Sequence, residues 1–320
     1  MINEKPTILV SAVSGDIGYA VVQALRTKVS RIIGCDLKPD TPVRHLLDHF
    51  YEVPPAADAI NYLFAVKDIL KQEGLGFFLP ISEPEIVLIH NRRKEFASLP
   101  VKLLLNNPLI LNTFLDKVET VNFLSNIGVR VPKTTSLHEY DGSFGFPVIV
   151  KARAGYGSKK LWKAEDLLDL EYIKRKYDTH YIVQECIGTP DEEYTTGVFS
   201  DGKKISSISF RRKLGVDGTT LEAILVRENR LHELSCRIAE TTSLIGSINI
   251  QSRRLGDMFI PFEINPRISG TILFRKQFGF EDVSWWINIL SGMEYYYKPL
   301  YKSGRAIRYY SECYFDMEKG

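Results

Sequence analysis

Over the first 108 residues, short apolar runs alternate with segments whose apolar positions have helical spacing. The segment 59–73 is amphipathic and is ended by Gly74, and Ile17, Val21 and Leu25 share the same helical spacing. The runs between such segments have the length and apolar character of buried strands: 7–12, 31–36, 77–80 and 101–105. Strands that alternate with helices predict a parallel sheet covered by helices. We therefore expect an α/β half-Rossmann domain over residues 1–108.

The turn after the first predicted strand carries part of a dinucleotide-binding pattern. Gly15 and Gly18 lie in this turn, and Asp36 ends the second strand, where an acidic residue would meet a ribose hydroxyl. Val13 stands where the first glycine of the pattern belongs. Two interpretations are open, NAD binding and a purely structural strand-to-helix turn, and the incomplete glycine pattern favours the second.

The pattern changes after Pro108, where longer β-forming runs appear. A helix is expected over 112–126, carrying Asp116 and Lys117, and another over 228–244. The other expected elements are strands within 144–152, at 161–162, 181–188, 246–253 and 257–265, and a hairpin of 191–199 with 204–210 around Asp201-Gly202. Arg211, Arg212 and Lys213 then follow as a basic loop.

Two neighbouring segments suggest that an anion is bound. Lys151 lies in the apolar run 148–152, where an ammonium group is costly unless it meets an anion or leaves to solvent at the strand end. In the basic loop that follows, Gly155 and Gly157 would let backbone amides approach a phosphate closely, although a flexible hairpin tip is the other interpretation. The chain contains no Walker loop of the form GxxxxGK[ST].

The run Phe262-Glu263-Ile264-Asn265-Pro266-Arg267 carries the most informative chemistry. Residues two apart on a strand face the same way, so Glu263 and Asn265 share one side, and Pro266 closes the strand. A carboxylate and an amide oxygen suit Mg²⁺ that carries phosphates, and Arg267 would meet the remaining charge. A strand edge with a local ion pair between Glu263 and Arg267 is the alternative.

Composition sets limits on these interpretations. The 320 residues are 44% hydrophobic and 25% charged, with a formal net charge of +2, so bulk charge gives no reason to expect nucleic acid or an anionic membrane as partner. The longest apolar runs are too short for a membrane span, and the N-terminus has no signal-peptide pattern. Four scattered cysteines form no CxxC pair, which argues against a zinc site or a disulfide framework. We expect a cytoplasmic protein.

These pieces, in this order, resemble the ATP-grasp superfamily, and most closely its carbamoyl-phosphate-synthase large-subunit-like branch. The resemblance rests on five motifs: Asp116-Lys117, the run 145–151, the Gly155/Gly157 loop, Gln184-Glu185-Cys186-Ile187-Gly188 followed by Glu193-Tyr194, and Glu263-Ile264-Asn265-Pro266-Arg267. It implies a half-Rossmann pre-grasp domain (1–108), a small ATP-grasp lobe with the glycine-rich loop (109–187) and a large lobe with the metal site (188–320).

The resemblance also implies roles for individual residues. ATP phosphates would be held by Lys117, Lys151 and the loop with Gly155, Gly157 and Ser158; adenine by Gln184, Glu185, Cys186 and Ile187; the ribose by Glu193; and Mg²⁺ (or Mn²⁺) by Glu263, Asn265 and Gln251. Arg267 would steady the transferring phosphoryl group. Gln251 departs from the Asp or Glu that is common in the family at its position, which leaves the metal site with one negative charge fewer.

The implied activity is that of an ATP-dependent carboxylate–amine (or carboxylate–thiol) ligase acting through an acyl phosphate. Arg212 and Lys213 are candidate anion contacts, and Arg275 is a candidate for a second substrate carboxylate. The expected partners are small-molecule carboxylate and amine substrates, with a homodimer as the assembly common in the family. Carbamate or bicarbonate phosphorylation, phosphotransfer to a hydroxyl, a nucleotide-binding pseudoenzyme and an NAD-dependent regulator remain as alternatives.

Overall fold

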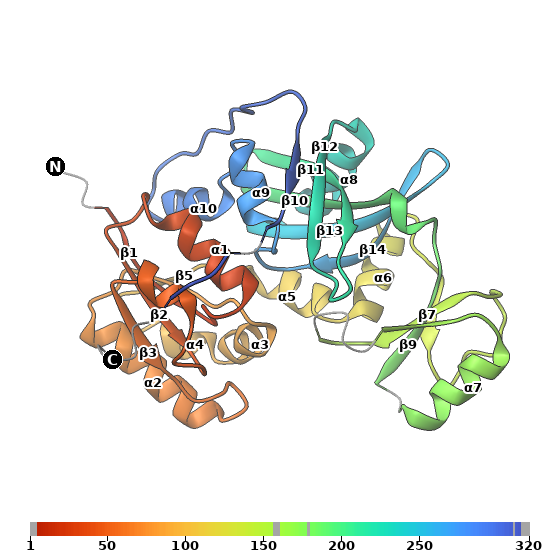
Figure 1. Cartoon of the computed structure of the whole chain (residues 1–320), viewed down its shortest axis with the longest axis horizontal. Helices are drawn as coiled ribbons and strands as arrows, with labels where there is room; N and C mark the ends of the chain where they lie inside the picture. Colours follow the sequence, from red (N-terminus) through yellow and green to blue (C-terminus); the bar gives the residue numbers. More distant parts are fainter. Residues whose placement is uncertain (1–4, 156–160, 178–179, 310, 315–320) are drawn as a thin grey trace.

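The computed structural model describes residues 5–155, 161–177, 180–309 and 311–314. Over these residues the chain forms three sheets, of five, four and six strands (Figure 1). The five-stranded sheet is parallel, and the strand pairs of the other two sheets are antiparallel throughout the described residues. This confirms the predicted class, a parallel α/β domain followed by a two-lobed grasp domain.

The N-terminal sheet has the strand order β3-β2-β1-β4-β5. Its strands are β1 (Thr7–Ser11), β2 (Arg31–Asp36), β3 (His49–Glu52), β4 (Phe77–Leu79) and β5 (Lys102–Leu103). The helices are α1 (Asp16–Leu25), η1 (Pro42–Leu46), α2 (Ala59–Gln72), α3 (Glu83–Asn91) and α4 (Arg93–Phe96). β3 was not predicted from the sequence, because none of its residues is fully buried and its apolar pattern is weak.

The four-stranded sheet has the order β6-β9-β7-β8 and forms a separate lobe with one helix (Figure 1). Its elements are β6 (Thr134–Ser136), β7 (Val148–Ala152), β8 (Leu161–Ala164), α7 (Leu167–Lys176) and β9 (Tyr181–Glu185). A compact core of its own includes Val148, Val150, Leu170 and Val183. This lobe therefore carries Lys151 on one of its central strands.

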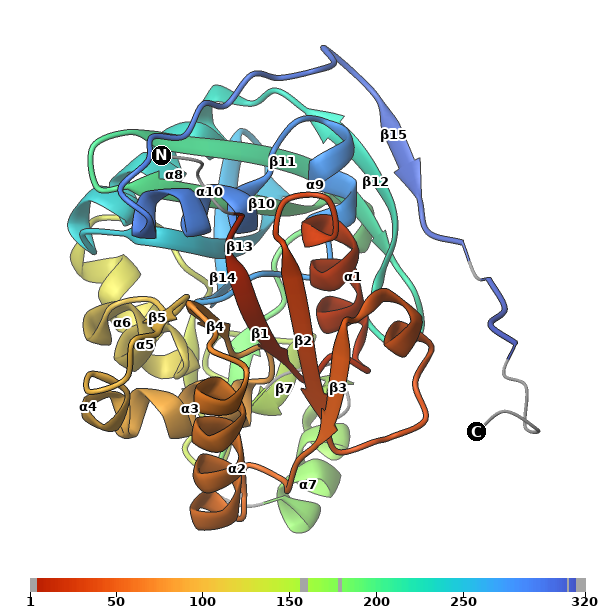
Figure 2. The ribbon, with the colours of Figure 1, turned by 90° about the vertical axis from the view of Figure 1, so that its left-hand side faces the viewer.

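The six-stranded sheet has the order β14-β13-β10-β11-β12-β15. Its elements, with the helices and the turn around it, are η3 (Pro190–Glu192), β10 (Glu193–Asp201), β11 (Ile205–Leu214), β12 (Thr220–Val226), α8 (Asn229–Thr241), β13 (Ile245–Leu255), β14 (Met258–Asn265), α9 (Ile272–Gln277), α10 (Asp282–Leu290) and β15 (Arg305–Ile307). Strand β15 returns from the C-terminal segment to the edge of β12 (Figure 2).

One hydrophobic core joins the N-terminal sheet to the six-stranded sheet. It brings together Val10 of β1, Val21 of α1, Phe210 of β11 and Trp286 of α10. A second core packs helices α5 (Pro108–Phe114) and α6 (Lys117–Asn126) with residues of β10, α8, β13 and β14. Residues 108–126 therefore pack with the six-stranded sheet, although they precede the small lobe in the chain.

Two local expectations were wrong, each with a clear cause. The helix predicted over 112–126 is divided, because the Asp116 carboxylate accepts hydrogen bonds from the backbone N–H groups of Val118 (2.8 Å) and Glu119 (3.2 Å) and caps a new helix. The basic cluster 211–213 is not in a loop, because β11 runs on to Leu214 through pairing with β12. Its side chains therefore alternate between the two faces of a sheet.

Candidate active site

A cavity of about 1820 Å³ lies between the four-stranded sheet and the six-stranded sheet. The residues that line it come from β7 and β9 on one side, from β10, β13 and β14 on the other, and from the first turn of α1. Most of the predicted site residues lie on its wall: Lys117, Lys151, Gly155, Gln184, Glu185, Ile187, Glu193, Gln251, Glu263, Asn265 and Arg267. The structure thus brings residues spread over 150 positions into one space.

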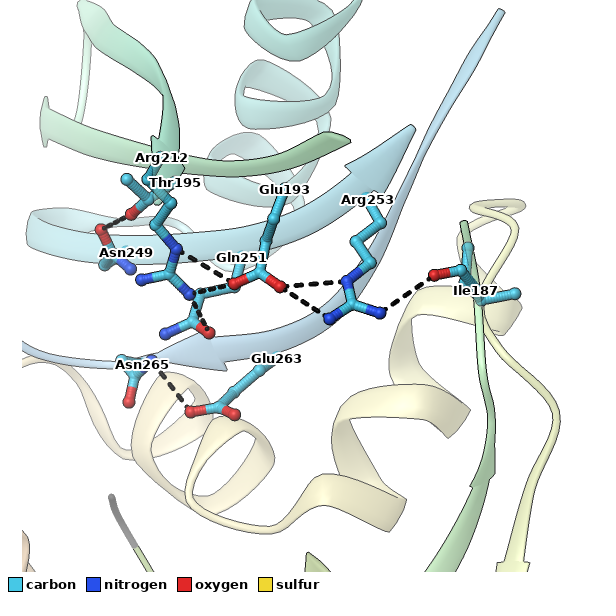
Figure 3. Close-up of polar contacts among 9 residues, drawn as sticks. All are labelled: Ile187, Glu193, Thr195, Arg212, Asn249, Gln251, Arg253, Glu263 and Asn265. Atoms are coloured by element: carbon cyan, nitrogen blue, oxygen red, sulfur yellow. Dashed lines mark hydrogen bonds and ion pairs between the residues drawn. The ribbon is translucent and has the colours of Figure 1, made fainter. Parts of the chain in front are cut away.

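The paired strands β13 and β14 present four oxygen-bearing side chains to this cavity. In the register, Gln251 lies opposite Glu263 and Asn249 lies opposite Asn265. Because residues two apart share a face of a strand, all four side chains line the cavity. The Asn265 amide donates a hydrogen bond of 3.1 Å to Glu263 Oε1 (Figure 3). This bond orients the Glu263 carboxylate and leaves the Asn265 amide oxygen free of that contact.

Glu263 is the one carboxylate among these four side chains, and cations surround it. Burial by itself would raise the pKa of Glu263, but Lys117, Lys151 and the Asn265 hydrogen bond hold that pKa below its ordinary value. Glu263 is therefore ionised at neutral pH. Within the described ranges no three His, Cys, Asp or Glu side chains gather closely enough to hold a metal, so a metal here would rely on Glu263 with amide oxygens.

Lys151 extends from β7 toward β14 across the cavity. Its Nζ donates to the carbonyl oxygen of Phe262 at 3.4 Å and lies 5.5 Å from the centre of the Phe262 ring. The residue is only 6% exposed. Burial lowers the pKa of Lys151 to about 8, and the nearby Glu263 opposes that shift. A buried ammonium with one weak hydrogen bond is suited to a phosphate ligand, which would replace the missing solvation.

Lys117 lies at the start of α6 and contacts the beginning of the glycine-rich loop. Its Nζ donates a hydrogen bond of 3.0 Å to the carbonyl oxygen of Gly155, whose φ of +107° suits glycine. The backbone N–H of Gly155 in turn donates to Glu83 Oε1 of α3, at 3.0 Å. Gly157 and Ser158, predicted to belong to the same loop, lie outside the described residues.

A carboxylate–arginine network connects the two sides of the cavity (Figure 3). Arg212 donates to Glu193 Oε1 from Nε (3.1 Å) and Nη2 (2.7 Å). Arg253 donates to Glu193 Oε2 from Nε (3.0 Å) and approaches it with Nη2 (2.9 Å). Arg253 Nη1 also donates to the carbonyl oxygen of Ile187, at 3.2 Å. The carboxylate of Glu193, the predicted ribose ligand, therefore already contacts four nitrogen atoms of two arginines.

Gln251 takes part in the same network. Its amide oxygen accepts a hydrogen bond of 2.9 Å from Arg212 Nη2 (Figure 3). A cation next to that oxygen would meet the positive guanidinium, so the metal role predicted for Gln251 has less support than those of Glu263 and Asn265. Asn249, two residues earlier on β13, faces the same cavity and has its amide oxygen paired with the Thr195 hydroxyl at 2.9 Å.

The predicted adenine-binding segment connects the small lobe to η3 and β10. The backbone N–H of Glu185 donates to the carbonyl oxygen of Lys133 (2.8 Å), and Glu185 Oε2 accepts from the N–H of Lys133 (3.1 Å). Gln184 donates to the Thr134 hydroxyl at 3.0 Å. Gln184, Glu185 and Ile187 line the cavity, whereas Cys186 is absent from its wall.

The family relationship follows from comparison with known proteins. Residues 179–313 match the family model described as "ATP-grasp in the biosynthetic pathway with Ter operon", and residues 9–104 match the model described as "PylC-like, N-terminal domain". The chain carries an ATP-grasp domain. A search of curated proteins gave no match.

Solved structures share this fold over most of the chain. The biotin carboxylase–beta-gamma-ATP complex of Campylobacter jejuni is 17% identical, with a TM-score of 0.74 over 91% of this chain and 72% of its own. N5-carboxyaminoimidazole synthetase of Staphylococcus aureus, complexed with ADP, is 15% identical, with a TM-score of 0.75 over 95% and 82%. A 2-oxoglutarate carboxylase biotin carboxylase domain dimer of Hydrogenobacter thermophilus, with MgADP, ADP and bicarbonate, is 14% identical, with a TM-score of 0.75 over 93% and 72%. At these identities the likeness establishes the fold, and the prediction of an ATP-grasp fold is confirmed.

Two residues predicted to belong to the site do not line the cavity. Lys213 is exposed and absent from the cavity wall, because it lies one residue from Arg212 on β11 and so faces the other way. Arg275, the candidate for a second substrate carboxylate, is 0% exposed and pairs with the equally buried Asp282 at 2.9 Å. Arg212 is therefore the member of the basic cluster that belongs to the site.

The contacts of Asp36 do not support NAD binding at the N-terminal turn. Its carboxylate accepts hydrogen bonds from the backbone N–H groups of Ser14 (2.8 Å), Leu37 (2.7 Å) and Lys38 (3.3 Å). Gly18 is required for packing, since a Cβ there would lie 2.3 Å from the carbonyl oxygen of Ala12. Both residues thus have structural roles in the β1–α1 turn. None of the helices in the described part of the chain combines the length and apolarity needed to cross a bilayer.

Sequence reasoning missed four residues of the site: Glu83, Arg253, Asn249 and Thr195. Strand alternation alone would have placed Asn249 beside Gln251, and Arg253 beyond it, on one face of β13. Glu83 had no such signal, because the contact with Gly155 joins two segments 72 positions apart.

Proposed function

We propose that this chain is an ATP-dependent ligase that joins a small carboxylic acid to an amine through an acyl phosphate. The observation that carries the proposal is the convergence of Lys117, Lys151, Glu263 and Arg267 on one cavity. Three cations around one ionised carboxylate suit a metal-bound triphosphate, because the carboxylate holds the metal and the cations meet the phosphates. The segment 184–187 on the same wall would receive the adenine.

In the proposed reaction the phosphoryl group moves to the acid. A carboxylate oxygen attacks the γ-phosphorus, the bond to the bridging oxygen breaks, and ADP leaves. The amine then attacks the carbonyl carbon, releases inorganic phosphate and loses one proton, which leaves an amide. Lys117, Lys151 and Arg267 would stabilise the negative charge that develops on the transferring group. The site needs no protein nucleophile for this chemistry.

The residues present fit Mg²⁺ with one firm ligand. Glu263 would hold the ion with its carboxylate, and the Asn265 amide oxygen lies on the same strand face. When bound, the ion would neutralise phosphate charge and fix the triphosphate against the two lysines. The protein's own contribution is the orientation of Glu263, which the hydrogen bond from Asn265 provides.

A second candidate is the phosphorylation of bicarbonate in place of an organic acid. It is favoured by the neighbouring structure of the Hydrogenobacter thermophilus carboxylase domain, which contains bicarbonate with ADP. The same cations would serve either acid, so the two candidates differ in substrate and share the site.

An ADP-release assay with Mg·ATP separates these candidates from one another and from simple nucleotide binding. The arms are amino acids with organic acids, bicarbonate with amines, and no added acid. Thermal shifts with Mg·ATP, Mg·ADP and NAD are measured in parallel. Stabilisation by NAD and by neither Mg·ATP nor Mg·ADP would refute the ligase proposal. Stabilisation by Mg·ADP with no turnover in any arm would favour a nucleotide-binding pseudoenzyme.

A further inference from the structure

The wall of the same cavity also includes a group of residues outside the predicted nucleotide site, which we call the far end. At this far end its wall is formed by Asp16 and Ile17 from the first turn of α1, by Gly270 and Thr271 before α9, and by Arg308 after β15. These residues come from the N-terminal domain, the large lobe and the C-terminal segment. None of them is among the residues predicted to bind the nucleotide or the metal.

Arg308 is held in a fixed orientation. Its Nη2 donates to the carbonyl oxygen of Gly270 at 2.8 Å, and its Nε donates to the carbonyl oxygen of Thr220 at 3.1 Å. The guanidinium carbon lies 5.6 Å from the centre of the Phe274 ring. A guanidinium has five N–H donors, so two backbone contacts orient the group and leave donors for a ligand. No carboxylate in the described part of the chain forms an ion pair with it within 4.0 Å.

Asp16 presents a negative charge beside it. A Cβ on Gly270 would lie 2.9 Å from Asp16 Oδ2 and 3.8 Å from Arg308 Nη2, so the two charged groups flank one glycine. Among the residues that the structure describes, none donates a hydrogen bond to the Asp16 carboxylate or pairs with it.

The buried Arg275 holds the loop 269–271, which lies between Asp16 and Arg308. Arg275 Nη1 donates to the Ser269 hydroxyl at 3.0 Å, and Ser269 is 2.9 Å from the Thr271 hydroxyl. Asp282 holds the guanidinium from the other side at 2.9 Å. The segment 269–271 is thereby fixed, and with it the spacing of the charges at Gly270.

We propose that this far end is a subsite for the head group of an α-amino acid, with its carboxylate on Arg308 and its ammonium on Asp16. A phosphate or a simple dicarboxylate would be repelled by Asp16, and a diamine by Arg308, whereas a zwitterion matches both charges. The inference deepens the proposed ligase function and rests on it.

The assignment of both α-groups to the subsite leaves the side chain as the part of the amino acid that reacts. Gly270 follows Arg267 by three positions, a span of at most about 10 Å. Because both α-groups are held at the far end, the group that reaches Arg267 belongs to the side chain. The substrate class is an α-amino acid whose side chain carries the reacting carboxylate or amine.

The test uses the full chain with Mg·ATP and pairs each amino acid with its deaminated counterpart. The probes are L-aspartate, L-glutamate and L-2-aminoadipate against succinate, glutarate and adipate, and L-lysine and L-ornithine against 6-aminohexanoate and 5-aminopentanoate. ADP release is measured for the wild type, for Asp16→Asn and Arg308→Met, and for the control Arg305→Met, whose exposed side chain pairs with Glu222 on β12.

We expect at least one amino acid to be used with a KM tenfold or more below that of its deaminated partner. Asp16→Asn should raise that KM about tenfold and remove the preference for the amino group, with the KM for ATP unchanged, and Arg305→Met should behave as wild type. Equal use of deaminated acids by the wild type, no response to any amino acid, or an unchanged KM in Asp16→Asn would overturn the inference. The Mg·ADP thermal shift of each protein reports separately on the nucleotide site and on folding, so its absence in the wild type would indicate failure of the ligase proposal itself.

Discussion

Glu83, the first residue of α3 in the N-terminal domain, accepts a hydrogen bond of 3.0 Å from the backbone N–H of Gly155 in the glycine-rich loop. Burial raises the pKa of Glu83, and the positive charges of Lys117 and Arg267 oppose that rise. A carboxylate of the N-terminal domain therefore lies among the groups that we assign to the phosphates. The contact couples the start of the loop to the domain that supplies Asp16 to the proposed subsite.

Replacing Glu83 should impair turnover more than nucleotide binding. We expect Glu83→Gln to lower kcat about ten- to hundredfold, because the substitution removes the negative charge that faces Lys117 and Arg267 and helps to position them. The dissociation constant for Mg·ADP should change less than threefold, since the adenine-binding segment is untouched. Steady-state kinetics and calorimetric titration measure the two effects.

Glu95→Gln is the matched control for this substitution. Glu95 lies in the same domain and pairs with Lys67 at the surface. A loss of Mg·ADP affinity in Glu83→Gln as large as its loss of kcat would contradict the positioning role.

Glu263→Ala should abolish ADP release with the fold retained. The substitution removes the carboxylate that faces Lys117 and Lys151 and that would hold Mg²⁺, so we expect a loss of at least about a hundredfold in kcat/KM. Circular dichroism checks the fold. Titration of ADP with and without Mg²⁺ should show strong Mg²⁺ dependence in the wild type and little in the variant, and wild-type turnover by Glu263→Ala would mean that the metal has been placed on the wrong residue.

The fold and the centre of the site could be predicted from the sequence, because both depend on local periodicity. Strand alternation placed Glu263 and Asn265 on one face, and an apolar run made Lys151 conspicuous before any contact was known. The same rule would have excluded Lys213 had β11 been extended beyond Phe210. Its true end at Leu214 depends on pairing with β12, which is a tertiary effect.

Other features depend on pairings that no local pattern reveals. Arg275 resembles a free surface cation in the sequence, and only the fold brings Asp282 against it in a fully buried pair. The short strand β15 and the anchoring of Arg308 likewise require β12 as a partner. Long-range electrostatic partners were therefore the part of the site that remained out of reach.

Arg253 should control nucleotide affinity, because it joins the buried carboxylate of Glu193 to the backbone of Ile187. We expect Arg253→Met to raise the KM for ATP about five- to twentyfold with a smaller change in kcat. Loss of one of the two arginines on Glu193 should also lower the free energy of unfolding by about 1–3 kcal/mol. Arg254→Met is the control, since Arg254 is the next residue of β13 and is exposed. Equal KM values for the two variants would refute the role of Arg253.

Glu85 should make the stability of the fold depend on pH, and the burial of its carboxyl group determines the sign of that dependence. Glu85 is buried and accepts hydrogen bonds from Ser11 Oγ (2.8 Å), Tyr62 OH (2.8 Å) and Ser82 Oγ (2.7 Å). Burial raises its pKa above the ordinary value of 4.5, against the lowering effect of these hydrogen bonds. Between the ordinary and the raised pKa the folded state binds more protons than the unfolded state, so stability contributed through Glu85 falls as the pH rises through this window.

Glu85→Gln should remove that dependence. The Tm of the variant relative to the wild type should therefore increase between pH 4.5 and pH 7, as measured by thermal unfolding in matched buffers. Glu73→Gln provides a control of opposite sign, because the Tyr51 hydroxyl and Arg31 hold the pKa of Glu73 below its ordinary value. The stability that Glu73 contributes is present above that value and is lost on acidification, so the relative Tm of Glu73→Gln should decrease over the same rise in pH. The same trend in both variants would show that burial does not govern the ionisation of Glu85.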